Sequence, residues 1–201
     1  MPRRPILIFA AVILLLAAGL SGYAWMARNS NGPGELGTAL VGGPFTLTDQ
    51  DGRKVSEKDF LGKYMLVFFG YTYCPDVCPT ELQVMTAAVD SLGADASNLQ
   101  PVFISVDPER DTPTVLRAYV ENFGPRLIGL TGTPEEVAAV AKAYRVYYAK
   151  AKGSTAADYL MDHSSIIYLM GPDGKFVKHF PYTTDATKLS KELKETITSS
   201  P

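Results

Sequence analysis

The sequence predicts an α/β domain behind an N-terminal membrane-spanning helix. From residue 42 onward, apolar β-rich runs alternate with stretches of helical periodicity, which indicates right-handed βαβ units in a mostly parallel sheet. The two cysteines of the chain lie where a buried run passes into a helix. The chain also opens on a long apolar stretch without charge, and such a stretch is typical of a membrane span.

The N-terminal stretch has the pattern of a single-pass anchor. Arg3 and Arg4 precede residues 5–27, which carry no charged side chain and are long enough to cross the hydrocarbon core as one helix. The arginines favour an N-terminus in the cytoplasm. A cleaved signal peptide is the alternative, because Gly22 and Ala24 are small residues at plausible positions before a cleavage site.

We therefore expect three parts: a membrane anchor (or signal peptide) over residues 1–28, a flexible linker over 29–41, and a folded domain over 42–201. The chain lacks a long leader rich in arginine and serine, which favours a bacterial inner (cytoplasmic) membrane over a mitochondrial one. The C-terminal domain would face the periplasm. The net charge of −2 supplies no basic surface for phosphates, so nucleic acid is excluded as a partner.

The apolar patterns predict the elements of the domain in order. Residues 45–48 alternate as a strand, turn at Asp51 and Gly52, and return at residues 54–55 as a hairpin. Residues 64–71 are almost continuously apolar, as in a central strand buried on both faces. Strands at 101–106, 127–130, 165–170 and 175–180, helices at about 115–123, 133–147 and 187–197, and a loop at 153–158 complete the order.

Two helix starts carry specific signals. Pro79 fits the first helical position, which would place Cys78 near the N-cap and Glu81 in the first turn. Thr133 and Glu136 form a capping box at the start of a later helix. The first of these helices has a core-facing stripe at spacings of three and four: Leu82, Met85, Val89 and Leu92.

Cys74 and Cys78 form a Cys-x-x-x-Cys motif at the first strand-to-helix turn. With this order of elements, the motif suggests a thioredoxin-like fold that has an N-terminal β-hairpin and an inserted helix and strand. A helix N-terminus stabilises a thiolate, so we expect the pKa of a cysteine there to lie below the ordinary value of about 8.5. The spacing permits a disulfide or a shared metal ion. A purely structural disulfide is the plain alternative, although so small a loop would stabilise little.

His163 is a candidate third donor. Strand ends of a mostly parallel sheet meet at one edge, and the antiparallel strand at 165–170 begins there, so His163 should approach the sulfurs, with Asp107 at the end of another strand. Two thiolates and one imidazole suit Cu(I), and the nitrogen also allows Cu(II). Zinc is the alternative, with Asp107 or water as a fourth ligand. Tyr71 and Tyr73 are predicted to wall the cleft.

Some of these residues also have plainer interpretations. Asp162 could cap or orient its neighbour His163, and Asp107 could brace its loop with Arg110. A lone histidine is often a packed or surface residue. The second histidine, His179, lies in an alternating strand, and we predict that it is on the surface.

Three motifs resemble those of the Sco (SenC) family of copper proteins that assemble cytochrome c oxidase. They are GYTYCPDVCP at residues 70–79, SVDPERDTP at 105–113 and YLMDHS at 159–164. The resemblance implies a tethered, thioredoxin-like domain that binds one copper ion. By residue, it implies Cys74 and Cys78 as thiolate ligands, His163 as the imidazole ligand and Asp107 as a supporting acid.

The resemblance implies a copper chaperone whose client is the binuclear copper centre of cytochrome c oxidase subunit II. An upstream periplasmic copper donor is a further candidate partner. The alternative is a thiol-disulfide reductase acting on the same client, in which Cys74 and Cys78 are the redox-active pair. The three-residue spacer and the histidine at the facing loop differ from the usual thioredoxin pattern. A redox or copper sensor would use the same residues, and we name no other catalytic residue.

Overall fold

The structure of the chain is a computed structural model, and it describes residues 19–22, 41–152 and 159–199. The chain divides into two compact units, residues 1–39 and 40–201. In the first unit, residues 19–22 are helical. Within the ranges that are described, no helix has both the length and the apolar character needed to span a membrane. Most of the predicted anchor and linker, and the predicted loop at 153–158, lie outside the described residues.

A seven-stranded sheet forms the centre of the second unit, with the strand order β2-β1-β5-β4-β3-β8-β9. The hairpin of β1 and β2, the central strand and the C-terminal pair of strands are all confirmed. The strands are β1 (Thr46–Asp49), β2 (Lys54–Ser56), β3 (Tyr64–Gly70), β4 (Leu99–Ser105), β5 (Ile128–Thr131), β8 (Ile166–Met170) and β9 (Phe176–Pro181).

The expectation of a mostly parallel sheet is wrong, because most pairs of neighbouring strands are antiparallel. Only β3 with β4 and β4 with β5 pair in parallel, whereas β1–β2, β1–β5, β3–β8 and β8–β9 are antiparallel. Tight turns join β1 to β2 and β8 to β9, and strands joined in this way can pair only in antiparallel fashion. The parallel part of the sheet is therefore confined to β3, β4 and β5, which are connected by the crossover helices α2 and α3.

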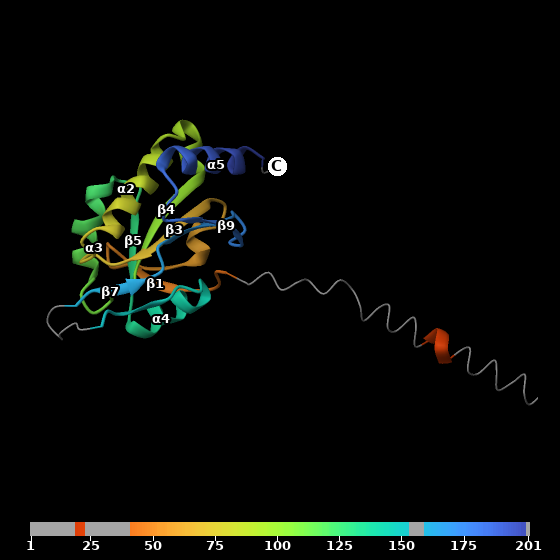
Figure 1. Ribbon diagram of the computed structural model, residues 1–201, viewed down its shortest axis with the longest axis horizontal. Helices are drawn as coiled ribbons and strands as arrows, with labels where there is room; N and C mark the ends of the chain where they lie inside the picture. Colours follow the sequence, from red (N-terminus) through yellow and green to blue (C-terminus); the bar gives the residue numbers. More distant parts are fainter. Residues whose placement is uncertain (1–18, 23–40, 153–158, 200–201) are drawn as a thin grey trace, which may run out of the picture. The chain divides into compact units, whose positions relative to one another are not determined.

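Helices cover both faces of this sheet. In Figure 1, α4 lies on the opposite side of the sheet from α2 and α5, and α2 packs directly against α5. The helices are α2 (Val77–Asp90), α3 (Pro113–Val120), α4 (Pro134–Ala143) and α5 (Ala186–Ser199), with 3-10 turns η1 (Glu57–Phe60), η2 (Gly93–Asn98) and η3 (Glu121–Phe123).

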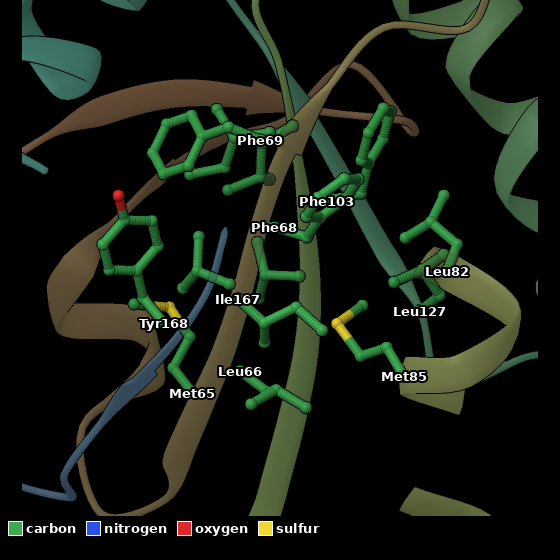
Figure 2. Close-up of a cluster of buried hydrophobic side chains, with 14 of the residues drawn as sticks. Met65, Leu66, Phe68, Phe69, Leu82, Met85, Phe103, Leu127, Ile167 and Tyr168 are labelled. Carbon is green, nitrogen blue, oxygen red and sulfur yellow. The ribbon is translucent and has the colours of Figure 1, made fainter. Parts of the chain in front are cut away.

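Strand β3 is the centre of the core, and each of its residues is buried. Figure 2 shows its side chains pointing to alternate sides: Phe69 lies toward Tyr168, while Leu82 and Met85 of α2 lie on the other side. The rings of Phe69 and Tyr168 meet edge to face at 6.2 Å between centroids. The expected burial is confirmed: Leu82, Met85 and Val89 of α2 are buried, as is Leu92, which follows the end of the helix at Asp90. This packing fixes the end of β3 and the start of α2, where the cysteines lie.

The sequence did not reveal a separate two-stranded sheet, formed by β6 (Tyr148–Lys150) and β7 (Met161–His163). Helix α4 was expected to continue to about residue 147, but it ends at Ala143. Arg145 then has a φ of 57°, a left-handed conformation that is typical of a helix end. The chain therefore leaves the helix before Val146, and strand β6, which begins at Tyr148, pairs with a distant part of the chain.

Candidate metal centre

The Cys74–Cys78 turn connects β3 to α2. The helix begins at Val77 with Asp76 at its N-cap, so Cys78 is the second helical residue and Pro79 the third, two positions later than predicted. A proline is tolerated at the third helical position as well as at the first, because the N–H groups of the first turn have no partner within the helix. The backbone N–H of Cys78 donates to Cys74 Sγ at 3.3 Å, so the helix N-terminus does support the Cys74 sulfur as expected.

The structure brings His163 to the two sulfurs. One ligand atom from each of Cys74, Cys78 and His163 lies within 4.8 Å of the others, and His163 Nε2 is 3.3 Å from Cys78 Sγ. His163 is the last residue of β7 and pairs with Tyr148 of β6. The approach therefore depends on the β6–β7 sheet, which the sequence did not predict.

The imidazole of His163 is held on several sides. Its ring meets the rings of Tyr71 and Phe68 edge to face, at centroid distances of 5.9 and 6.1 Å. Its Nδ1 lies 3.3 Å from the backbone carbonyl oxygen of Ser164. A carbonyl oxygen only accepts hydrogen bonds, so this contact assigns the proton to Nδ1 and leaves the lone pair of Nε2 facing the sulfurs.

The two thiols have different environments. Cys78 is buried and Cys74 is partly exposed, and both are free cysteines. The hydrogen bond from the Cys78 thiol lowers the pKa of Cys74, burial opposes this shift, and the N–H of Cys78 adds to it. The same hydrogen bond and burial raise the pKa of Cys78. The pair therefore loses its first proton from Cys74, which becomes an accessible thiolate above a buried thiol.

Gly70 makes room for the buried sulfur at the end of β3. A Cβ atom at this position would lie 2.8 Å from Cys78 Sγ and 2.9 Å from Cε2 of Phe103. Both distances are shorter than real Cβ contacts, and the neighbours are packed in the core. The glycine therefore permits a close approach of strand and sulfur.

Neither of the two acidic residues proposed as supporting groups belongs to the cluster of three donors. Asp107 is buried, pairs with Arg110 and accepts a hydrogen bond from the Tyr159 hydroxyl at 2.8 Å. Its bracing of the loop, the plainer of its two interpretations, is confirmed. Asp162 is exposed on β7, and the atom next to His163 Nδ1 is the Ser164 carbonyl instead. Side chains alternate along a strand, so Asp162 and His163 face opposite sides.

Asp111 supports the cysteine turn, a role that the sequence did not indicate. Its buried carboxylate accepts hydrogen bonds from the Thr72 N–H at 3.0 Å, the Thr72 hydroxyl at 2.6 Å and the Ser105 hydroxyl at 2.6 Å. Burial raises the pKa of this carboxyl, and these hydrogen bonds partly offset the rise. Asp107 and Asp111 share one motif, and nothing in the sequence shows which of them faces the cysteine turn.

A groove of about 290 Å³ opens beside the donors, with Cys74, Pro75, Leu160 and His163 among its lining residues. Tyr71 also lines it and is buried, as predicted for a wall residue. Tyr73 is instead 62% exposed. His179 is exposed on β9, as predicted. Because Cys78 is buried, Cys74 is the sulfur that a second molecule can reach through the groove.

The donor set decides which metals fit. Two sulfurs and one imidazole nitrogen are the ligands that Cu(I) prefers, and the nitrogen also accepts Cu(II). A structural zinc site normally has four protein ligands. Asp107, the residue that the sequence offered as the fourth, is engaged with Arg110 and Tyr159. The three residues therefore fit copper better than zinc.

Comparison with known proteins gives a consistent result. The family model described as SCO1/SenC matches residues 33–198. The chain is 50% identical over 147 residues to the human mitochondrial SCO1 homolog, covering 72% of this chain and 49% of that protein. The Arabidopsis thaliana mitochondrial SCO1 homolog 1 is 47% identical over 164 residues, or 79% and 49% of the two chains. The chain thus spans about half the length of these curated relatives.

Solved structures agree with the sequence comparisons. Arabidopsis ScoI with copper bound has a TM-score of 0.75 and 46% identity, covering 80% of this chain and 99% of that one. Bradyrhizobium japonicum ScoI with copper bound has a TM-score of 0.72 and 47% identity, covering 77% and 98%. BsSco, described as a member of the Sco family of cytochrome c oxidase assembly proteins with a disulfide switch, has a TM-score of 0.65 and 28% identity, covering 80% and 95%.

Proposed function

Because the chain belongs to the SCO1/SenC family, we propose that it is a copper chaperone for cytochrome c oxidase. Cys74, Cys78 and His163 bind one copper ion, which is delivered to the binuclear copper centre of subunit II during assembly. The observation that carries this proposal is the position of the three ligand atoms, all within 4.8 Å of one another. The copper-bound relatives of the same fold support it.

The arrangement of the donors suits delivery of a metal ion as cargo. Cys78 and His163 hold the ion from the protein side, because Cys78 is buried and His163 is fixed between aromatic rings. Cys74 lines the groove, so a client thiolate can approach at this donor and replace it. The displaced Cys74 sulfur stays stable as a thiolate, because the Cys78 N–H donates to it. Transfer then needs no change in the oxidation state of the ion.

A thiol-disulfide reductase is the second candidate, and the difference between the two thiols favours it. The Cys74 thiolate would attack a client disulfide, forming a mixed disulfide and releasing one client thiolate. The Cys78 sulfur, after losing its proton, would then attack Cys74 and release the second. The chain ends as a Cys74–Cys78 disulfide and the client as a dithiol, so two electrons pass to the client. BsSco, with its disulfide switch, is a related protein.

The cellular location of the chain is a separate part of the proposal. The curated relatives are mitochondrial. We propose a bacterial inner membrane for this chain, with residues 1–28 as anchor, residues 29–41 as linker and the domain at 42–201 facing the periplasm. That arrangement would place the metal centre on the side of the membrane where the copper centre of subunit II is exposed.

Copper transfer distinguishes the two candidates. The full chain is loaded with one copper ion and mixed with the reduced copper-binding domain of subunit II, whose centre is followed by its absorption. We expect the client centre to form, and to fail with Cys74→Ser or Cys78→Ser because each removes a thiolate. His179→Ala is the matched control, since His179 is exposed on β9. If the copper stays on the chain while the copper-free dithiol reduces an oxidised client, the protein is a reductase.

A further inference from the structure

The donors of the metal centre come from two separate sheets. Cys74 and Cys78 follow β3 of the main sheet, whereas His163 ends β7 of the two-stranded sheet. A two-stranded sheet is only marginally stable alone. The position of His163 relative to the sulfurs therefore depends on the side chains that connect the two-stranded sheet to the rest of the domain.

Arg110 makes such a connection at Tyr159, four residues before His163. Its Nη1 donates to the Tyr159 carbonyl oxygen at 2.9 Å, and its guanidinium lies 3.6 Å from the centroid of the Tyr159 ring. The Nε of Arg110 pairs with Asp107, which also accepts the Tyr159 hydroxyl at 2.8 Å. Backbone, ring and hydroxyl of Tyr159 are thus all fixed to the loop that follows β4.

The same loop also contacts the cysteine turn. The guanidinium carbon of Arg110 is 4.6 Å from the centroid of the Tyr73 ring and 5.8 Å from that of Tyr71. One residue further, Asp111 holds Thr72 through its N–H and its hydroxyl. Residues 107–111 therefore contact both segments that supply donors: Asp111 holds the cysteine turn, and Arg110 contacts both Tyr159 and the tyrosine rings of the cysteine turn.

We propose that Arg110 is a positioning residue that sets His163 against the two sulfurs; this inference rests on the proposed copper site. A planar guanidinium can pair with Asp107 through Nε, donate to Tyr159 through Nη1 and stack on the ring at the same time, which a lysine ammonium cannot do. Groups that orient a metal ligand typically contribute about 10–100-fold to metal affinity. Arg110 acts on the site through Tyr159 and the strand that ends at His163, and its guanidinium also packs against the ring of Tyr71, which contacts the His163 imidazole.

A double-mutant cycle on Cu(II) affinity of the full chain tests this role. We expect Arg110→Gln to weaken binding about 10–100-fold, because His163 loses its fixed position. Adding His163→Ala to that variant should then weaken binding much less than His163→Ala does alone. Arg117→Gln is the matched control: Arg117 lies on α3 and pairs with Asp51, so its effect should be small and should simply add to that of His163→Ala.

A second measurement needs no copper. In the copper-free chain, ring protons of His163 should be shifted by the rings of Tyr71 and Phe68 in NMR spectra. Arg110→Gln should reduce that shift while Arg117→Gln preserves it. Alkylation of Cys74 should change little in either variant, because Asp111 still holds Thr72 of the cysteine turn through its N–H and its hydroxyl. If Arg110→Gln does not fold, Arg110→Lys takes its place in the cycle and in the spectra.

The outcomes separate the positioning role from the metal site itself. The positioning role would be overturned if the fold-losses of Cu(II) affinity from the Arg110 and His163 substitutions simply multiplied and the His163 spectrum did not change. The copper site itself would be unaffected by that result. An unchanged affinity after His163→Ala alone would instead remove His163 as a ligand, and the proposed function would fail first.

Discussion

Glu81 is a buried acidic side chain, 2% exposed, on the first turns of α2. The sequence placed it in the first turn, where a carboxylate is stabilised by the helix N-terminus. Because α2 begins at Val77, Glu81 is the fifth helical residue and faces the interior. Burial raises its pKa to about 7, and its Oε2 has no hydrogen-bond partner among the described residues. This carboxyl therefore takes up a proton near neutral pH when the chain folds.

The raised pKa of Glu81 predicts a pH-dependent loss of stability. Between the ordinary pKa of 4.5 and about 7, the folded carboxyl binds a proton that the unfolded one has released. The free energy of unfolding should thus fall by up to about 3 kcal/mol as pH rises through this window. Glu81→Gln should remove this part of the pH dependence.

Urea denaturation of wild type and Glu81→Gln at several pH values between 4.5 and 8 measures the effect. Glu195→Gln, at an exposed position of α5, serves as the control and should follow the wild type. Parallel curves for wild type and Glu81→Gln would show that the buried carboxyl is not protonated in the fold.

Individual residues differ in how far the sequence could predict them. Cys74, Cys78 and His163 could be proposed because the chain has two cysteines and two histidines and their chemistry is specific. Asp107 and Asp111 are chemically identical and lie in one motif, so only the folded loop shows that Asp111 holds Thr72 while Asp107 holds Arg110 and Tyr159.

Among the elements, α4 has the start that its sequence specifies. Thr133 accepts a hydrogen bond from the Glu136 N–H at 3.2 Å, and the Glu136 carboxylate accepts one from the Thr133 N–H at 2.9 Å. Pro134 occupies the first helical position. These two reciprocal bonds satisfy donors that the helix itself leaves free.

Loss of this cap should destabilise the domain without altering the metal centre. We expect Thr133→Ala to lower the free energy of unfolding by about 0.5–2 kcal/mol, as measured by chemical denaturation. Thr133→Ser keeps the hydroxyl and is the matched control, with most of the stability retained. The cap would not act as described if the alanine and serine variants were equally stable.

The elements that the sequence predicted have local signals, and those that it missed do not. A capping box, a tight turn or an apolar stripe is complete within a few residues, so β1, β2, α2 and α4 could be placed. Strands β6 and β7 are three residues each, and they exist because Tyr148 pairs with His163 and Lys150 with Met161. No short stretch of sequence carries that information.

For the whole molecule, the metal centre depends on where two sheets meet. The main sheet fixes the cysteines through β3 and α2, and the β6–β7 sheet carries His163. The order of elements predicted that His163 returns to the edge where the cysteines lie, because β8 runs antiparallel to β3. It could not predict the side chains that connect the two sheets, among them Arg110 and Tyr159.

We propose that Cys74, Cys78 and His163 together hold one copper ion. The sequence contains two histidines, so the second provides an exact control. The decisive measurement is a copper titration of the full chain, compared with its His163→Ala and His179→Ala variants. We expect one ion per chain, an affinity weakened at least about 10-fold by His163→Ala and unchanged affinity with His179→Ala. Equal affinities in the two variants would contradict it.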